Sequence, residues 1–294
     1  RTGCRTLTGL RLPGCCWHEY KGEKRMREEN LTAGIRSPRR FEADRMIAVA
    51  SGKGGVGKTW FSITLAHALS GLRQKTLLFD GDLGMANIDV QLGLMVPFDL
   101  GSVVTGTTTL NQVVHYCDKC RFDVIAGRSG SAGLASMPVG RLQILAEDLA
   151  LLSGAYDKVI LDMGAGVEKS IRILSGMSGR VIVVCTDEPT ALTDAYAFVK
   201  LMAMQYPKCR LEIVVNQADT LREGRQTYDI LQKACQTFLK ISPPLLGIVR
   251  RDARVRDAIR NQMPLISRYP TSEAAADVIE IARKILQDEK NVQS

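Results

Sequence analysis

The chain is organised around the stretch Ser51-Gly52-Lys53-Gly54-Gly55-Val56-Gly57-Lys58-Thr59. An apolar run, residues 47–50, precedes it, and a helix-like segment, residues 58–70, follows it. A strand, a glycine loop and a helix start form the context of a phosphate-binding loop, and the spacing fits the template G-x-x-x-x-G-K-[ST]. The glycines let consecutive backbone N–H groups surround an anion, and the helix start adds its own unpaired N–H groups. The alternative is a glycine-rich turn without a ligand. Because motif, strand and helix agree, we favour a nucleoside triphosphate site.

Three side chains of the loop have separate expected roles. Lys58 should reach the terminal phosphates, and the Thr59 hydroxyl should hold Mg²⁺. Lys53 is a second lysine near the start of the loop. From there its ammonium could reach a phosphate bound by a second subunit, where charge builds up in the transition state. The alternative for Lys53 is an exposed loop lysine. The expected phosphate-binding residues are Gly52, Lys53, Gly54, Gly55, Val56, Gly57, Lys58 and Thr59.

Beyond the loop, short apolar runs alternate with helical patterns. This alternation predicts an α/β fold, doubly wound, with a mostly parallel sheet of about seven strands and helices on both faces. The expected strands are residues 47–50, 76–79, 122–126, 158–161, 180–185, 211–215 and 245–249. The expected helices are residues 58–70, 139–152, 168–177, 190–206, 223–239 and 272–287. We expect one domain over residues 46–287, with a polar tail over residues 288–294.

Two apolar runs end in aspartates that would complete a metal site. The run 158–161 leads into Asp162, the arrangement of a Walker B strand whose carboxylate orients the waters of Mg²⁺. The run 76–79 leads into Asp80-Gly81-Asp82, where a carboxylate could orient the water that attacks the γ-phosphate. The alternative for each aspartate is helix capping or a turn.

Charge and cysteine usage narrow the possible partners. The net charge is +8 over 294 residues, and residues 1–45 hold 11 Lys/Arg against 6 Asp/Glu. We expect this segment to be a basic, disordered extension, although it could also contact anionic lipid or nucleic acid. The 8 cysteines are scattered, which indicates a reducing cytosol. No run approaches the ~18 apolar residues of a membrane span.

Three other groups of residues have weaker functional interpretations. His115, Cys117 and Cys120 are possible metal ligands, but a structural zinc site normally has four, so a surface turn with reduced thiols is favoured. His67 lies on the apolar helix after the loop and is expected to be packed in the core. Several arginines between residues 250 and 260 could bind nucleic acid, but acidic residues interleave with them and a solvated or partner-facing surface is favoured.

The loop resembles the deviant Walker A loop of the MinD/ParA ATPases. The segment Asp80-Gly81-Asp82-Leu83-Gly84-Met85-Ala86-Asn87-Ile88-Asp89 is similar to their switch segment. More narrowly, this segment and Glu188-Pro189-Thr190-Ala191-Leu192-Thr193-Asp194-Ala195-Tyr196 resemble the FlhG branch (also called FleN or YlxH), whose members regulate flagellar number and placement. Trp60 departs from the pattern, because the family usually has a small residue there.

The resemblance implies a slow, dimer-dependent ATPase that acts as a molecular switch with ATP and Mg²⁺. Lys53 would act across the homodimer, and Asp82 would position the attacking water. Thr59, Asp80 and Asp162 would serve the metal, and Asn216 would hydrogen-bond the adenine edge. The alternative for Asn216 is a turn or cap residue.

The resemblance also implies partners and a location. The expected partners are flagellar assembly or regulatory proteins: an FlhF-like GTPase, the flagellar switch or a transcriptional regulator. The location would be cytoplasmic, with at most weak or transient contact with the inner face of the cell membrane. Two alternatives stay open: a ParA-like partition ATPase that binds DNA non-specifically, for which the balanced charge of residues 46–294 makes DNA an unlikely partner, and a MinD-type division-site regulator.

Overall fold

Eight strands form one sheet in the order β3-β4-β2-β5-β1-β6-β7-β8. The structure is a computed structural model that describes residues 43–127 and 137–293, so the expected extension over residues 1–45 lies almost wholly outside the described residues. All neighbouring strands are parallel except β3 and β4, which are antiparallel. The strands are β1 (Met46–Ser51), β2 (Thr76–Gly81), β3 (His115–Cys117), β4 (Phe122–Ile125), β5 (Lys158–Ala165), β6 (Arg180–Cys185), β7 (Arg210–Ala218) and β8 (Leu245–Arg250).

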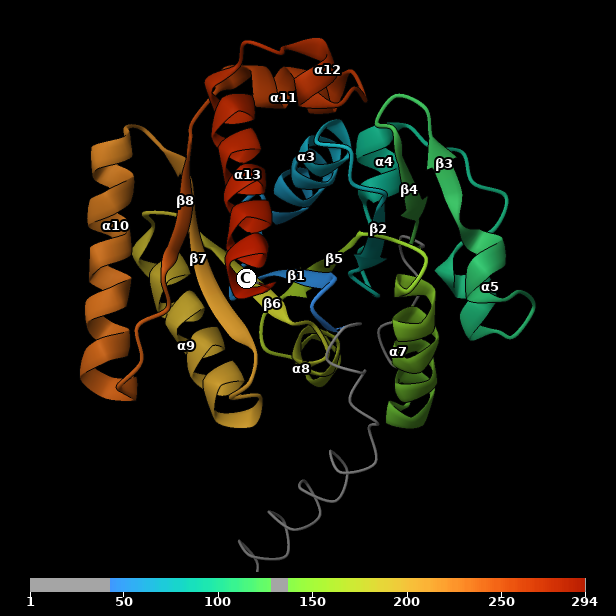
Figure 1. Ribbon diagram of the computed structural model, residues 1–294, viewed down its shortest axis with the longest axis horizontal. Helices are drawn as coiled ribbons and strands as arrows, with labels where there is room; N and C mark the ends of the chain where they lie inside the picture. Colours follow the sequence, from blue (N-terminus) through green and yellow to red (C-terminus); the bar gives the residue numbers. More distant parts are fainter. Residues whose placement is uncertain (1–42, 128–136, 294) are drawn as a thin grey trace, which may run out of the picture. The chain divides into compact units, whose positions relative to one another are not determined.

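Helices cover both faces of this sheet, which confirms the predicted α/β fold. On one face α3 contacts β1, β2 and β5, and α13 lies beside α3 and β8. On the other face α8 contacts β1 and β5, α9 contacts β6, and α10 contacts β7 and β8 (Figure 1). The longer helices are α3 (Lys58–Gly71), α7 (Val139–Ser153), α8 (Lys169–Gly176), α9 (Pro189–Gln205), α10 (Leu221–Ala234), α11 (Ala253–Arg260) and α13 (Glu273–Gln293). The short elements are α4 (Ile88–Leu92), α5 (Leu100–Val104), α12 (Leu265–Arg268), a 3-10 turn (Leu110–Val113) and a π-helical turn (Cys235–Leu239).

The central strands are apolar along most of their length because they are covered from both sides. Every residue of β1 and β6 is buried. Parallel strands between two helical layers lack the alternation of apolar and polar residues that is typical of a strand with one solvent-exposed face. The strand order places the carboxyl ends of β1, β2 and β5 next to each other, because β5 lies between β1 and β2. Ligands of open parallel sheets bind at this edge.

The predicted strand limits were too short at the carboxyl edge. β2 continues to Gly81 and β5 continues to Ala165, so Asp80 and Asp162 lie inside the strands and not after them. The eighth strand, β3, was not predicted, because it has only three residues, His115–Cys117, of which only Cys117 is buried.

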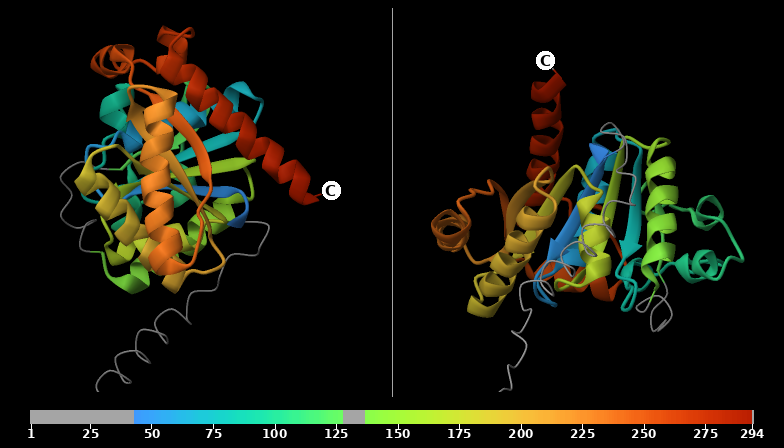
Figure 2. Two further views of the ribbon diagram at one scale, coloured as in Figure 1. Left: turned by 90° about the vertical axis from the view of Figure 1, so that its left-hand side faces the viewer. Right: turned by 90° about the horizontal axis from the view of Figure 1, so that it is seen from below.

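The end of the chain binds the opposite edge of the sheet. The sequence predicts a polar tail over residues 288–294, but α13 continues to Gln293 and its last turns project past the strands (Figure 2). Asp288 lies 2.6 Å from the guanidinium of Arg210, and Glu289 lies 2.6 Å from the ammonium of Lys158. None of the described helices is both long and apolar enough to span a membrane.

A buried ion pair lies beneath these contacts. The Arg180 guanidinium donates to Glu212 at 3.0 Å, and both side chains are almost fully buried. Asp288 lies 3.7 Å from Arg180, which joins the buried pair to α13. Burial lowers the pKa of Arg180 and raises the pKa of Glu212, while each charge acts against the shift of the other. Each of these two buried charges is stabilised by the other, because neither is solvated by water.

We expect Glu212→Ala to lower the free energy of unfolding by about 3 kcal/mol, because Arg180 would stay buried without its main partner. Chemical denaturation at pH 7 measures this change. The control is Glu280→Ala, which removes the exposed pair between Glu280 and Arg283 and should cost less than about 0.5 kcal/mol. Equal losses in the two variants would contradict the importance of the buried pair.

Candidate nucleotide-binding site

The phosphate loop leaves β1 at Ser51 and enters α3 at Lys58. Gly57 has φ 85° and ψ 21°, a left-handed conformation that starts the helix, and a Cβ there would lie 2.5 Å from Asn216 Nδ2. Gly52 is also restricted, since a Cβ there would lie 2.2 Å from the backbone of Asp194 on α9. Glycine is therefore required at both ends of the loop, at one end by close packing and at the other by backbone conformation as well.

The first turn of α3 is joined to β5 by a buried cluster. Lys58 Nζ lies 3.8 Å from Asp162 Oδ1, and the Ser62 hydroxyl donates to the same oxygen at 2.9 Å. Thr59, at the start of the helix, is also buried, and its hydroxyl favours the ionised form of Asp162. Burial raises the pKa of Asp162, although the charge of Lys58 and the two hydroxyl groups act in the opposite direction. The Oδ2 atom of Asp162 is buried and has no hydrogen-bond partner within the described part of the chain.

Asp80 connects this cluster to the expected switch segment. It is paired in register with Asp162 on the neighbouring strand. Its carboxylate accepts backbone N–H groups of Asp82 at 3.3 Å, Asn87 at 3.1 Å and Ile88 at 3.2 Å, so it holds the two ends of the segment that leads into α4. Burial, together with the nearby charge of Asp162, raises the pKa of Asp80 to about 7.

Asp82 lies on the same edge with more access to solvent. It is half-buried, its Oδ1 accepts the backbone N–H of Met85 at 3.0 Å, and its carboxylate lies beside the backbone of Gly164 at the end of β5. Met85 is 73% exposed, so this part of the segment faces outward. The arrangement leaves Asp82 near the phosphate side of the site, and its predicted role with the attacking water stays a prediction.

These residues fit a magnesium ion bound together with phosphates. The site offers one hydroxyl, two buried carboxylates and an unsatisfied carboxylate oxygen, all of them oxygen donors. Within residues 43–127 and 137–293, no three His, Cys, Asp or Glu side chains form a group that would hold a metal alone. Mg²⁺ characteristically takes few protein ligands and keeps water and phosphate oxygens. Thr59 would hold the ion, and Asp80 and Asp162 would orient its waters.

Lys53 points away from the buried cluster. Its Nζ lies 2.5 Å from Glu188 Oε1 and 2.6 Å from the Thr190 hydroxyl, both at the start of α9. The side chains of Lys53 and Glu188 are 31% and 57% exposed. The hydrogen bond from Lys53 is the main cause that lowers the pKa of Glu188. Lys53 therefore lies at the rim of the loop, on the protein surface.

Asn216 supports the loop from β7. Its Nδ2 donates to the Val56 carbonyl at 2.8 Å, and its side chain is almost fully buried. The predicted contact with adenine would use the oxygen of the same amide, and it stays a prediction. Within the described chain Asn216 is the residue whose amide fixes the far end of the loop before Gly57.

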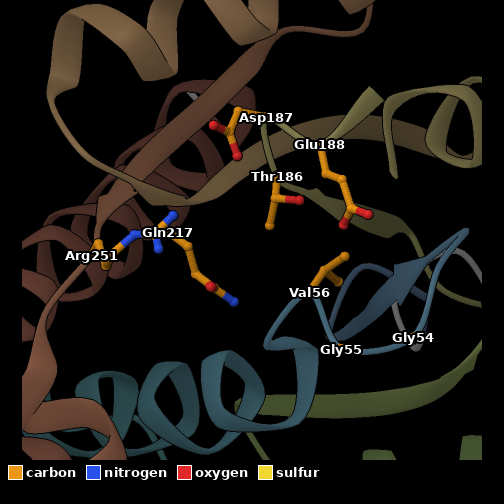
Figure 3. A pocket seen from close by; sticks show the side chains of 8 residues that line it. All are labelled: Gly54, Gly55, Val56, Thr186, Asp187, Glu188, Gln217 and Arg251. Atoms are coloured by element: carbon orange, nitrogen blue, oxygen red, sulfur yellow. The ribbon is translucent and has the colours of Figure 1, made fainter. Parts of the chain in front are cut away.

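An open pocket of about 280 Å³ lies beside the loop. Figure 3 shows Gln217 and Arg251 side by side, across the opening from Gly55 and Val56, with Glu188 at another side. Arg251 Nε lies 2.9 Å from Asp219, an ion pair between two exposed side chains. A nucleotide base or a ribose could enter between the side chains of Gln217 and Arg251 on one side and the loop on the other.

Several residues of the site were not found from the sequence. Ser62 lies one helical turn after Lys58, so its position toward Asp162 follows from helical spacing. Glu188, Thr190, Gln217 and Arg251 are separated from the loop by more than a hundred residues. Only the tertiary fold brings them to it.

The known proteins to which this chain is similar include nucleotide-binding proteins and flagellar proteins. Residues 47–265 match the family model described as the CobQ/CobB/MinD/ParA nucleotide binding domain. The chain is 32% identical to the antiactivator FleN of Pseudomonas aeruginosa over 82% of this chain and 86% of that protein. It is 28% identical to the flagellum site-determining protein YlxH of Helicobacter pylori over 87% of each chain. The septum site-determining protein MinD of Pyrococcus horikoshii, solved as a complex with Mg-ADP, has the same fold with a TM-score of 0.70, at 24% identity over 82% of this chain and 96% of that one.

We expect Asp80→Asn to stabilise the metal-free protein at high pH. The folded-state pKa of Asp80 is raised from 3.8 to about 7, so the contribution of Asp80 to the stability of the wild type is fully present below pH 3.8 and is lost as the pH rises through about 7. Asparagine has no charge to bury, so the variant should exceed the wild type by roughly 2–4 kcal/mol at pH 8 and by much less at pH 4. Urea unfolding with a chelator present measures both. The matched change Asp229→Asn, at an exposed helical pair, should alter stability by less than about 0.5 kcal/mol at either pH. If the variant exceeded the wild type in free energy of unfolding by the same amount at both pH values, the buried charge of Asp80 could not be the cause.

We expect Asn216→Ala to weaken ATP binding by about 10- to 100-fold and GTP binding by less, because adenine offers an amino group at C6 to the amide oxygen, whereas guanine has a carbonyl oxygen there. Isothermal titration with both nucleotides measures the two changes. Gln226→Ala, at an exposed position of α10, is the matched control and should change neither. Equal losses for ATP and GTP would restrict Asn216 to holding Val56.

Proposed function

The chain belongs to the CobQ/CobB/MinD/ParA nucleotide-binding family, and from this premise we propose that it is an ATP-driven molecular switch that acts as a homodimer. ATP and Mg²⁺ would bind at the phosphate loop, two copies would associate, and water would then cleave ATP to ADP and phosphate. The dimer would be the signalling state. Turnover would be slow, because one subunit alone has an incomplete site.

The position of Lys53 carries this proposal. Of the two lysines in the phosphate loop, Lys58 is buried. Lys53 lies at the surface, where it hydrogen-bonds to Glu188 and Thr190. A surface lysine at the rim of a phosphate loop can enter the site of a facing copy with a small movement. There it would stabilise the charge that develops as the γ-phosphate leaves. Asp82, on the outward side of the switch segment, would orient the attacking water.

The biological role that we propose is regulation of flagellar number or placement. Support comes from the similarity to FleN and from the similarity to YlxH, which is named as a flagellum site-determining protein. Partners would be flagellar assembly or regulatory proteins, such as an FlhF-like GTPase. Regulation of the division site is the alternative, because septum site-determining MinD proteins are also among the relatives of this chain.

The arginines near residue 250 give little support to a role in DNA partition. Arg250 contacts Asp277 at 2.8 Å, Arg251 contacts Asp219, and Arg254 lies near Asp252. Arginines that are already paired with carboxylates have less charge available for phosphates. Binding to non-specific DNA that requires ATP and weakens steeply with salt would favour this alternative.

We expect the wild type to dimerise with a non-hydrolysable ATP analogue and Mg²⁺ and to be monomeric with ADP, measured by light scattering after size exclusion. Lys58→Ala should bind no nucleotide. Lys53→Ala and Asp82→Ala should bind ATP but hydrolyse it at least about 100-fold more slowly than the wild type. Asp82→Ala should still dimerise. Lys233→Ala, on α10 away from the loop, is the matched control and should behave as wild type. A wild type that stays monomeric with the analogue would refute the switch, and normal turnover in Asp82→Ala would remove Asp82 from its role.

The flagellar role needs a separate test in cells. Deletion of the gene should change the number or position of flagella, and the Lys58→Ala allele should not restore them. Misplaced division septa with normal flagella would instead favour the division-site alternative.

A further inference from the structure

A pair of cysteines outside the nucleotide site occupies the turn between β3 and β4. Cys117 is the last residue of β3, and the backbone N–H of Cys120 donates to the Cys117 carbonyl at 3.0 Å. This hydrogen bond defines a β-turn, whose first and last Cα atoms lie within about 7 Å. A disulfide spans Cα distances of about 4.4–6.8 Å, so the turn holds the two residues at a bridgeable separation.

The two sulfur atoms already face each other. The Cys117 thiol donates to Cys120 Sγ at 2.8 Å, and the two residues are 2% and 0% exposed. The S–S bond length is about 2.05 Å, so closure requires an approach of about 0.8 Å. Among the cysteines that the structure describes, Cys209 instead donates to backbone carbonyls, and Cys185 is buried inside β6.

The turn is held in place from outside. The Ser70 hydroxyl at the end of α3 donates to the Arg121 carbonyl, and the Ser267 hydroxyl of α12 donates to the Lys119 carbonyl at 3.3 Å. Asp118 and Lys119 are exposed at the tip. The turn is therefore anchored between two helices while its tip meets solvent, and the two thiols keep their mutual orientation.

A structural metal is less well supported at this turn. The sequence groups His115 with the two cysteines, but the His115 ring lies 3.0 Å from the Phe98 carbonyl. Two thiols with no further ligand side chain among the described residues do not make a tetrahedral zinc site. A lone pair of thiols in contact is instead the arrangement from which a disulfide forms.

The electrostatics assign different roles to the two thiols. When Cys117 ionises, the hydrogen bond with Cys120 stabilises its thiolate and is the main cause that lowers the pKa of Cys117, and the charge of Lys119 acts in the same direction. The same hydrogen bond and burial raise the pKa of Cys120. Cys117 is therefore the sulfur that carries negative charge first, and a thiolate is the reactive form of cysteine.

We propose that Cys117 and Cys120 form a reversible dithiol–disulfide site that is oxidised by hydrogen peroxide. The Cys117 thiolate attacks one peroxide oxygen, the O–O bond breaks, and the departing hydroxide takes a proton to become water. The product is a sulfenic acid at Cys117. The Cys120 sulfur then attacks Cys117 Sγ, the S–O bond breaks, and hydroxide leaves with the Cys120 proton as a second water. The two sulfurs together lose the two electrons that peroxide gains, and an external dithiol reverses the step.

The test uses the full chain, reduced and then treated with a small excess of hydrogen peroxide under native conditions. Remaining thiols are alkylated after denaturation, and the peptides are analysed by mass spectrometry. We expect a peptide pair linked between Cys117 and Cys120, and alkylation of both residues should fall by about tenfold, because a thiol with a lowered pKa and a second sulfur 2.8 Å away reacts before buried thiols that lack such a neighbour. Dithiothreitol should restore alkylation, and Cys185 and Cys235 should stay fully alkylated throughout.

Two variants separate the pair from general oxidation. Cys120→Ala should give no linked peptide and should leave a sulfenic acid at Cys117 that dimedone traps, and Cys120→Ser serves the same purpose if the first variant does not fold. Cys185→Ser should keep the link. The proposal fails if both cysteines of the folded wild type stay alkylated after peroxide, or if Cys117 is linked to another cysteine.

Discussion

The site depends on a lysine and an aspartate that are buried together at the carboxyl edge of the sheet. Lys58 and Asp162 are 8% and 1% exposed, and their charged atoms are 3.8 Å apart, beyond a good hydrogen bond. The second oxygen of Asp162 has no partner in the described protein. A buried pair of this kind is costly unless further charges complete it. A phosphate against Lys58 and a metal-bound water against Asp162 would do so, which explains why the arrangement suits a ligand better than it suits an empty core.

The same edge links ligand binding to the outward segment. Asp80 lies beside Asp162 and holds the backbone of residues 82–88 through three N–H groups. A change in charge at the metal position therefore acts on Asp80 through space and on the segment through hydrogen bonds. Gly127, two residues after β4, packs against Asp80 and Ala86, so the residues that follow the neighbouring strand also confine the segment. This connected set is a physical route by which nucleotide state would change the surface of the protein.

Much of this could be predicted from the sequence because it depends on local patterns. The loop between β1 and α3 is encoded by adjacent residues, and the central strands are recognisable as continuous apolar runs. The limits of β2 and β5 were wrong because Asp80 and Asp162 interrupt the apolar pattern, although the backbone pairing continues through them. The three-residue β3 gave too short a pattern to recognise.

Other features could not be predicted because they depend on tertiary contacts. Lys53 meets Glu188 across 135 positions of sequence, and Asn216 meets Val56 across 160. The continuation of α13 was also hidden, since its final polar residues are typical of a tail until Arg210 and Lys158 are placed beside them. Charge alone gives no information about which partner a side chain will have.

The contacts of α13 have a consequence for how the protein is made. Lys158, Arg180 and Arg210 begin β5, β6 and β7, while their partners Asp288 and Glu289 are translated after all eight strands. Until the end of α13 is translated, Lys158 lacks Glu289, while Arg180 and Arg210 have Glu212 but not Asp288. The sheet and the phosphate loop can therefore form before the opposite edge receives its contacts from α13. The last ionic contacts form only once this segment has emerged from the exit tunnel.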